Sequence, residues 1–321
     1  MLIPLRASFL FLLAFATAPA APRDESRYVW LDAPAQHLFE STPLGNGRLG
    51  ASLYGGVAET RIVLNESGMW SGSPQDADRP DAHKALPEIR RLLLAGKNHE
   101  AEALVNANFT CAGAGSGFGT GANVPFGCYQ TLGDLRLTFT GDSVSAPVTH
   151  YRRELDLAEA IGRVTYQQNG VRFTREAFVS APAEAVVIRL TASRPGTISF
   201  DARLSRPERV AVETAGRDGL LMTGQLNDGR EGGTGVHYAA RLKIVPHGGT
   251  IATVGGAAQV RNADEVLLFV TAATDIKTFA GRHLADARAA AEADLVSASV
   301  RPFSELRAEH IADYQHYFSR V

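Results

Sequence analysis

The chain has 321 residues, of which 45% are hydrophobic and 21% are charged, and its formal net charge at pH 7 is −2. This composition is that of an ordinary soluble globular protein, with enough apolar material for a real core. The near-neutral charge gives no reason to expect nucleic acid or an anionic membrane surface as a partner.

The first twenty residues have the pattern of a secretory signal peptide. Arg6 supplies a positive charge, residues 7–16 (ASFLFLLAFA) are apolar, and Ala18-Pro19-Ala20 offers a cleavage site of small residues. The apolar run is short for a membrane span, and an N-terminus that stays anchored is the alternative. We therefore expect residues 1–20 to be removed and the mature protein to be secreted or periplasmic, without membrane contact after signal removal.

A first strand is expected at residues 28–31 (YVWL), and the stretch 43–72 follows it with glycine-rich turns and a strand-like run, RIVL. Polar and aromatic side chains placed directly after such turns are candidates for ligand contact. The simpler interpretation is that the glycines only shape hairpins and that Trp70 fills a core. The candidates for contact with substrate or with another domain are Asn46, Arg48, Asn65, Glu66, Trp70 and Tyr129.

A helical insertion is predicted at residues 87–108, where Pro87 suits a first helical position and Gly96 separates two helices. Cys111 and Cys128 then flank a glycine-rich loop. In an oxidising compartment they are a possible disulfide, and two buried thiols are the alternative. Neither a CxxC pair nor a closely spaced histidine pair accompanies them, so the sequence predicts no metal site.

From residue 132 to residue 274 the hydrophobic pattern has a period of two, with short strands separated by turns. Asn169-Gly170 lies between two alternating runs, which is the signal of a two-residue hairpin of type I′. Such a series predicts a mainly β chain with a large antiparallel β-sandwich. Glu154 and Asp156 alternate with leucines along one strand, which indicates a solvated face.

The pattern becomes helical again near the end of the chain. Residues 282–297 are alanine-rich, and Pro302 opens a second helix that carries aromatic residues up to its last turn. This ending suggests the front part of a longer protein. The expected organisation is therefore a signal peptide (1–20), a β-sandwich domain (24–279) and a helical linker (280–321) that leads to a missing domain.

Motifs of known chemistry are not found in the sequence. It contains no nucleophile elbow, phosphate loop, dinucleotide fingerprint or metal-binding helix, and no cofactor is expected. GNGRLG resembles a dinucleotide motif only loosely, because no βαβ unit follows it. Glu66 and Asp134 lie beside glycine turns and are the acids to consider for a site. From these residues alone no reaction can be assigned.

Long blocks of the sequence resemble the N-terminal domain of glycoside hydrolase family 95, which contains α-L-fucosidases and some α-L-galactosidases. The resemblance covers nearly the whole mature chain, in order. It is carried by PLGNGRLGASLYGG, LNESGMWSGSPQDADRPDA, NVPFGCYQTLGDLRLTF, YRRELDL, FTREAFVSAPAEAVVIRL and SELRAEHIADYQHYF.

The resemblance implies an architecture and a reaction. It implies a super-sandwich, a helical linker, an (α/α)6 catalytic barrel and a C-terminal β domain, with configuration at the anomeric carbon inverted by a glutamic acid and an activated water. The catalytic residues of the family lie in the barrel, so none is assigned to this chain. The implied partners are a fucosylated oligosaccharide or polysaccharide and the chain's own missing catalytic domain. The alternatives are activity on α-L-galactosides and a stand-alone carbohydrate-binding sandwich.

Overall fold

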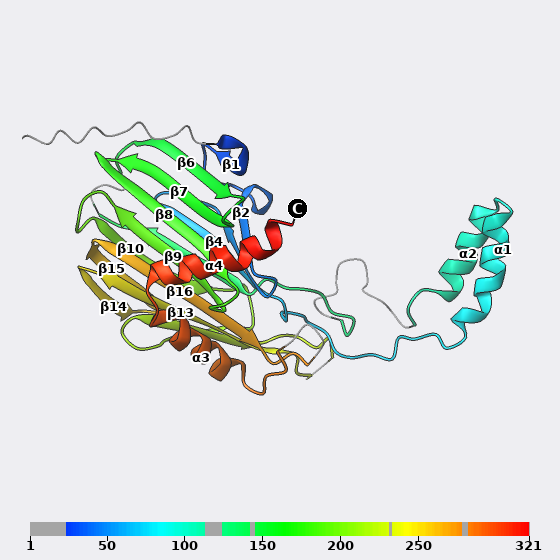
Figure 1. The fold of residues 1–321 in the computed structure, drawn as a ribbon. Coiled ribbons are helices and arrows are strands. Elements are labelled where there is room, and N and C mark those ends of the chain that lie inside the picture. The colour runs from blue at the N-terminus through cyan, green and yellow to red at the C-terminus, as the bar shows by residue number, and fades with distance from the viewer. Residues whose placement is uncertain (1–23, 113–123, 142–144, 231–232, 278–281, 321) are drawn as a thin grey trace, which may run out of the picture.

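Two antiparallel β-sheets packed face to face form the body of the molecule (Figure 1). The computed structural model describes residues 24–112, 124–141, 145–230, 233–277 and 282–320. The predicted fold class, a large antiparallel sandwich with a helical insertion and C-terminal helices, is confirmed. The predicted signal peptide and most of the loop between the two cysteines lie outside the described residues.

One sheet has nine strands in the order β1-β6-β7-β8-β9-β16-β13-β12-β11, and the other has seven in the order β14-β15-β10-β5-β4-β3-β2. The nine are β1 (Tyr28–Leu31), β6 (Val148–Asp156), β7 (Ile161–Gln168), β8 (Val171–Ser180), β9 (Ala185–Ala192), β16 (Glu265–Thr274), β13 (His237–His247), β12 (Gly219–Gln225) and β11 (Ala211–Thr214). The seven are β14 (Thr250–Val254), β15 (Ala257–Ala263), β10 (Ile198–Ser205), β5 (Gly133–Phe139), β4 (Glu59–Glu66), β3 (Leu49–Leu53) and β2 (Thr42–Gly45).

The main core lies between the two sheets, where alternate residues of each strand meet. On β5, Leu135 and Leu137 are buried and Arg136 between them is half-buried, as the period of two predicts. The Asn169-Gly170 turn between β7 and β8 has positive φ at both residues, 50° and 73°. That is the conformation of a type I′ turn, so the predicted hairpin is confirmed.

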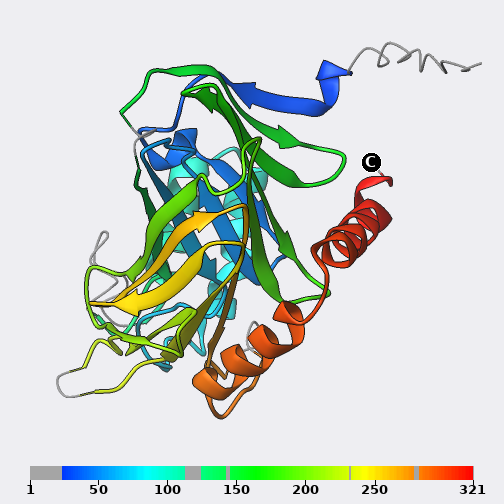
Figure 2. The ribbon, with the colours of Figure 1, turned by 90° about the vertical axis from the view of Figure 1, so that its left-hand side faces the viewer.

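Two helices cover the outer face of the nine-stranded sheet, and Figures 1 and 2 show both beside it. Helix α3 (Ala287–Ser299) begins after Asp286, whose side chain accepts hydrogen bonds from two backbone N–H groups of the first turn. Three of its four buried residues are alanines, which lets the helix lie close to β13 and β16. Helix α4 (Phe303–Phe318) packs on β8, where Leu306 joins Phe178 in a second apolar cluster.

Helix α4 is held to the turn between β6 and β7 by side-chain hydrogen bonds to four consecutive carbonyl groups, those of residues 157–160. Tyr314 donates to the carbonyl oxygen of residue 157 at 2.7 Å, and Gln315 donates to that of residue 158 at 3.2 Å. His310 Nε2 lies 3.0 Å and 3.2 Å from the next two. The imidazole also stacks on Phe178 with ring centroids 4.7 Å apart. The position of α4 is therefore fixed by directional contacts as well as by apolar packing.

The prediction of a solvated face for Glu154 and Asp156 is wrong. Both side chains point to the outer face, but the two residues are only 4% and 2% exposed. Glu154 pairs with Arg152 at 2.6 Å and with Arg163 at 3.1 Å, and Asp156 pairs with Arg27 at 3.1 Å. Alternation along a strand identifies the face that a residue occupies, but not what covers that face.

The helical insertion forms a hairpin that stands away from both sheets (Figure 1). It consists of the 3-10 turn η3 (Ala82–Ala85), helix α1 (Leu86–Leu94) and helix α2 (Asn98–Asn108), which confirms the predicted insertion. Ile89, Leu92 and Ala101 are buried between the two helices. Two further 3-10 turns, η1 (Glu25–Arg27) and η2 (Leu38–Glu40), flank β1.

His310 makes the packing of α4 dependent on pH. Burial lowers the pKa of His310 below its ordinary value of 6.5, so the folded chain holds the neutral ring. The stability that it contributes is fully present above about pH 6.5, the pKa of the unfolded state, and is lost as the pH falls through the lowered pKa. We expect His310→Gln to lower the free energy of unfolding by about 1 kcal/mol near neutral pH and to flatten its decline on acidification.

The measurement is urea unfolding of the parent chain and of His310→Gln at about pH 7.5 and about pH 5, on either side of the ordinary histidine pKa. His316→Gln is the matched control, because His316 lies exposed on the same helix. An equally steep loss of stability in His310→Gln and in the parent chain would contradict the assignment.

Candidate functional site

The six candidate residues lie at one end of the sandwich, although they come from three separate places in the sequence. Asn46 and Arg48 occupy the turn between β2 and β3, and Asn65 and Glu66 end β4. The register places Leu49 opposite Glu66 in the sheet. Trp70 and Tyr129 follow as an isolated antiparallel bridge. The structure therefore gathers the six into one region, which divides into a buried polar part and an exposed aromatic part.

Asn46 builds the turn that presents Arg48. Its side-chain oxygen accepts hydrogen bonds from the backbone N–H groups of Arg48 and Leu49, at 2.9 Å and 2.7 Å. Its side-chain amide donates to the carbonyl of Ser180 on the nine-stranded sheet at 3.0 Å. Asn46 thus closes the turn and ties it to the other sheet.

Arg48 and Glu66 form the centre of a largely buried ion-pair network between the sheets, which reaches the surface at Glu184. The Arg48 guanidinium lies 2.5 Å from Glu184 and 3.4 Å from Glu66, and it donates to the carbonyl of Ala272 at 2.7 Å. The second oxygen of Glu66 accepts from the backbone N–H of Gly68 at 2.7 Å and from Thr274 at 3.1 Å. Both oxygens of Glu66 are therefore engaged.

Sequence reasoning missed the partners that complete this network. Glu184, Thr274 and Asp294 are separated from Arg48 by more than a hundred positions, and Asp294 lies on α3, 3.8 Å from the guanidinium. Arg282 pairs with the same aspartate at 2.5 Å. Ordinary residue types at such separations give no local signal. Only the packing of the two sheets and α3 brings them together.

Trp70 and Tyr129 form the exposed part of the site. The rings meet edge to face with centroids 5.8 Å apart, and the two residues are 45% and 41% exposed. The Tyr129 hydroxyl donates to the side-chain oxygen of Asn65 at 3.0 Å and lies 3.3 Å from the carbonyl of Glu66. Burial of the phenol end, with the charge of Glu66 nearby, raises the pKa of Tyr129 to about 12. The ring is therefore a neutral, oriented platform.

The two segments that connect the sandwich to the helical hairpin meet beside this aromatic pair. The backbone N–H of Ser71 donates to the carbonyl of Cys128 at 3.0 Å, and the backbone N–H of Cys128 donates to the Ser71 hydroxyl at 3.0 Å. Gly127, at φ 74°, approaches Ser71 so closely that a Cβ would meet its carbonyl oxygen. Cys111 is exposed, Cys128 is half-buried, and both are free thiols in the structure. The disulfide stays a prediction.

The remaining acid considered from the sequence, Asp134, forms surface ion pairs. It contacts Arg61 of the neighbouring strand β4 at 2.8 Å and Arg136 of its own strand, β5, at 3.4 Å. Among the residues that the structure describes, no group of three or more His, Cys, Asp or Glu side chains is arranged to hold a metal ion. Within the same ranges, no helix is both long and apolar enough to cross a membrane.

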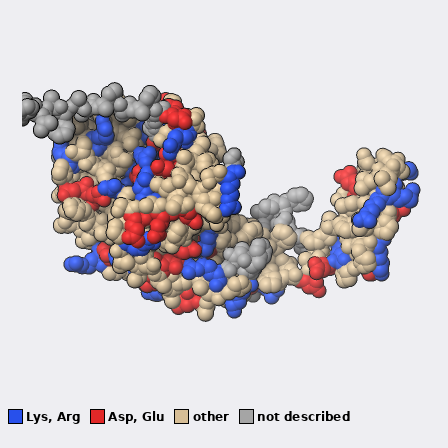
Figure 3. Space-filling model, viewed as in Figure 1, with Lys and Arg blue, Asp and Glu red and all other residues tan. Residues whose placement is uncertain are grey.

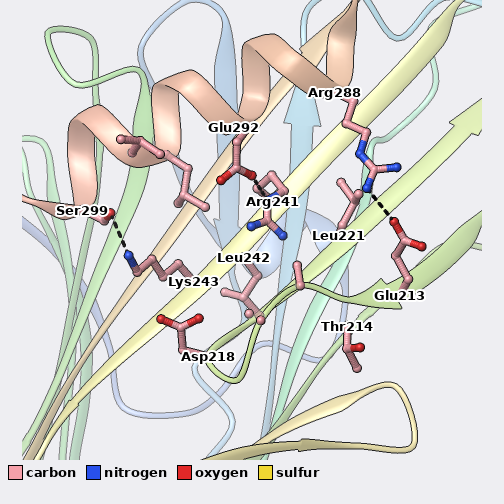
Figure 4. Close-up of a pocket in the computed structure, with 15 residues that line it drawn as sticks. Glu213, Thr214, Asp218, Leu221, Arg241, Leu242, Lys243, Arg288, Glu292 and Ser299 are labelled. Atoms are coloured by element: carbon pink, nitrogen blue, oxygen red, sulfur yellow. Dashed lines mark hydrogen bonds and ion pairs between the residues drawn. The ribbon is translucent and has the colours of Figure 1, made fainter.

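A hollow separate from these residues lies between α3 and the strands β12 and β13 (Figure 4). Its volume is about 380 Å³. Its charges are largely paired: Arg241 contacts Glu292 at 2.5 Å and Arg288 contacts Glu213 at 3.0 Å, while Lys243 donates to Ser299 at 3.3 Å. These pairs join the helix to the sheet. The residues that line the hollow include no aromatic side chain on which a sugar ring could stack, whereas Trp70 and Tyr129 provide such rings.

Removing the cation at the centre of this network is expected to destabilise the fold. Replacing Arg48 with Met leaves the Glu66 and Glu184 carboxylates without their cation, so we expect a loss of about 3 kcal/mol in the free energy of unfolding. The measurement is chemical denaturation at neutral pH. Arg91→Met is the control, since Arg91 forms an exposed pair with Glu88 within α1 and its loss should change stability far less. Equal midpoints for the two variants would contradict a structural role.

Comparison with known proteins places this arrangement in a family. Residues 29–278 match the family model described as "Glycosyl hydrolase family 65, N-terminal domain". The chain is 29% identical to "Alpha-L-fucosidase 2" of Arabidopsis thaliana over 94% of its own length and 39% of that protein. It is 26% identical to "Probable alpha-fucosidase A" of Aspergillus niger, over 94% and 38% of the two chains. The chain thus spans about two fifths of these relatives.

A solved structure supports the same fold. The protein named "Putative kojibiose phosphorylase from human microbiome" superposes with a TM-score of 0.52 at 11% identity, covering 92% of this chain and 38% of that one. Identity at this level shows the fold alone. Since the family model covers most of the chain, the chain belongs to the family of glycosyl hydrolase family 65 N-terminal domains.

Proposed function

We propose that this chain is the N-terminal domain of an exported inverting α-L-fucosidase of glycoside hydrolase family 95, acting on fucosylated plant or host glycans. The observation that carries the proposal is the similarity to α-L-fucosidase 2 over 94% of the chain. The sequence blocks that resemble family 95 support the same assignment. The matched family model, which is named for family 65, supports an N-terminal glycoside hydrolase domain more generally.

The chemistry of the described residues supports an accessory role for this domain. A general acid needs a carboxyl group that can reach the glycosidic oxygen. Glu66 is buried, and both of its oxygens already accept hydrogen bonds or contact Arg48. Glu66 is therefore a poor candidate for the acid. Following the resemblance to family 95, we place the acid and the water-activating groups in an (α/α)6 barrel after the helical linker at residues 280–321.

The Trp70–Tyr129 pair is the part of this domain that we assign to the junction with the barrel. Its rings are exposed, oriented by Asn65 and uncharged at neutral pH. An aromatic face can stack on a sugar or pack against another domain, and binding sites favour such junctions. Asn46, Arg48 and Glu66 support this face from beneath, because they fix the turn and the strand end from which it extends.

The first test is enzymatic and uses the complete gene product. We expect it to release L-fucose from fucosylated oligosaccharides, with the β-anomer formed first, whereas the 321-residue chain alone releases none. The measurement is proton NMR of the reaction at early times. Release of L-galactose in place of fucose would replace the proposed substrate with an α-L-galactoside and leave the assignment to family 95 intact. A coding sequence that ends at Val321, with glycan binding measured by calorimetry, would replace the proposal with a stand-alone binding sandwich.

The second test concerns export. In an oxidising compartment we expect Cys111 and Cys128 to form a disulfide that adds on the order of 3 kcal/mol of stability by restricting the unfolded chain. Non-reducing peptide mapping of protein purified from the periplasm or the medium should find one linked pair. Two thiols that alkylate without prior reduction in such material would remove this support for export.

A further inference from the structure

The helical arm, which we define as residues 82–109, stands apart from the sandwich (Figure 1). Its two connecting segments meet where Ser71 and Cys128 exchange hydrogen bonds, directly beside Trp70 and Tyr129. Within the arm, α1 packs on α2 and on η3. The segments that carry the arm therefore leave the sandwich beside the aromatic pair, and the arm itself lies beyond them.

The arm has apolar side chains on two sides, and its own packing covers only one of them. Ile89 and Leu92 are buried against α2, whereas Leu93 is 52% exposed and Leu94 is 91% exposed. Val105 and Phe109 of the other limb are also exposed. Helices of nine and eleven residues gain most of their stability from tertiary packing. An exposed leucine side on so small a hairpin points to a second surface that covers it.

The charges of the arm indicate what kind of surface this is. Glu88 pairs with Arg91 at 2.6 Å, Lys97 pairs with Glu100 at 3.3 Å, and Lys84 pairs with Asp81 at 2.8 Å. Figure 3 shows both signs on the arm and interspersed over the sandwich. Charges neutralised within the arm do not attract a polyanion, and leucine side chains cannot hydrogen-bond a sugar. The matching partner is an apolar protein surface.

We propose that the exposed leucine side of the helical arm packs against the domain that follows this one in the complete polypeptide, and thereby holds that domain beside Trp70 and Tyr129. This inference rests on the proposed function. The chain spans 39% and 38% of its fucosidase-named relatives, and the matched family is that of an N-terminal domain. A large body of further polypeptide therefore accompanies such a domain in those relatives, and a partner in the same chain docks at high effective concentration.

The experiment is hydrogen exchange of the backbone amides at residues 92–95 and 104–109, compared between the complete gene product and the 321-residue chain. We expect exchange in the complete protein to be slower by about tenfold or more, because docking suppresses local opening of the arm. Leu94→Asp in the complete protein should abolish this protection. Val254→Asp is the matched control, since Val254 is an exposed valine on the sandwich, in β14, and its substitution should leave the protection intact.

The outcomes separate this inference from the proposed function. Fast exchange of the arm in a complete protein that still releases fucose would overturn the docking and keep the enzymatic assignment. Protection that appears in an inactive protein, and that Leu94→Asp removes, would keep the docking and overturn the activity. Protection that rises with protein concentration, together with a dimer in sedimentation, would assign the leucine side to a second copy and overturn the proposal.

Discussion

The nine-stranded sheet is apolar on both faces at its centre, so each face must be covered by another part of the structure. On β9, Val186 and Ile188 face the seven-stranded sheet, while Ala185 and Val187 face the other way. One partner sheet can cover only one of these faces. Burial of apolar surface is the main favourable term in folding, so the outer face needs a cover of its own. Helices α3 and α4 supply it.

The covering helices also determine where charge is buried. Beneath and beside α4, an alternating ladder of side chains crosses neighbouring strands, with Arg163 between Glu154 and Glu176. Arg307 of α4 joins this ladder at Glu176. A buried charge is tolerated when it is paired and hydrogen-bonded, so the ladder fixes the position of the helix more than it adds stability.

Burial and hydrogen bonding also distinguish the two parts of the candidate site. Arg48 and Glu66 lie where the two sheets and α3 meet, and their hydrogen-bonding capacity is used within the fold. Trp70 and Tyr129 lie just beyond that junction, exposed and oriented, where the segments that carry the helical arm leave the sandwich. A rigid polar base beneath an exposed aromatic platform is suited to a domain boundary, where recognition depends on side chains held in place by the scaffold.

Local sequence determined much of the architecture. The Asn169-Gly170 turn, the alternation along β5 and the two short helices around Gly96 were all predicted, because turn chemistry and hydrophobic period depend on near neighbours in the chain. The sequence also selected six residues that the fold gathers at one end. It could not separate the buried Glu66 from the exposed Trp70, since the two lie on either side of the same turn at Gly68.

Only the tertiary structure decided which faces are covered. Glu154 and Asp156 have the pattern of a solvated face, yet both are buried beneath paired arginines. Arg48 contacts Glu184, which lies 136 positions away in the sequence. Alternation assigns a side chain to one face of a strand, whereas its burial depends on elements that arrive from elsewhere in the chain. That long-range packing carries no local pattern, and for this reason it could be read only from the folded molecule.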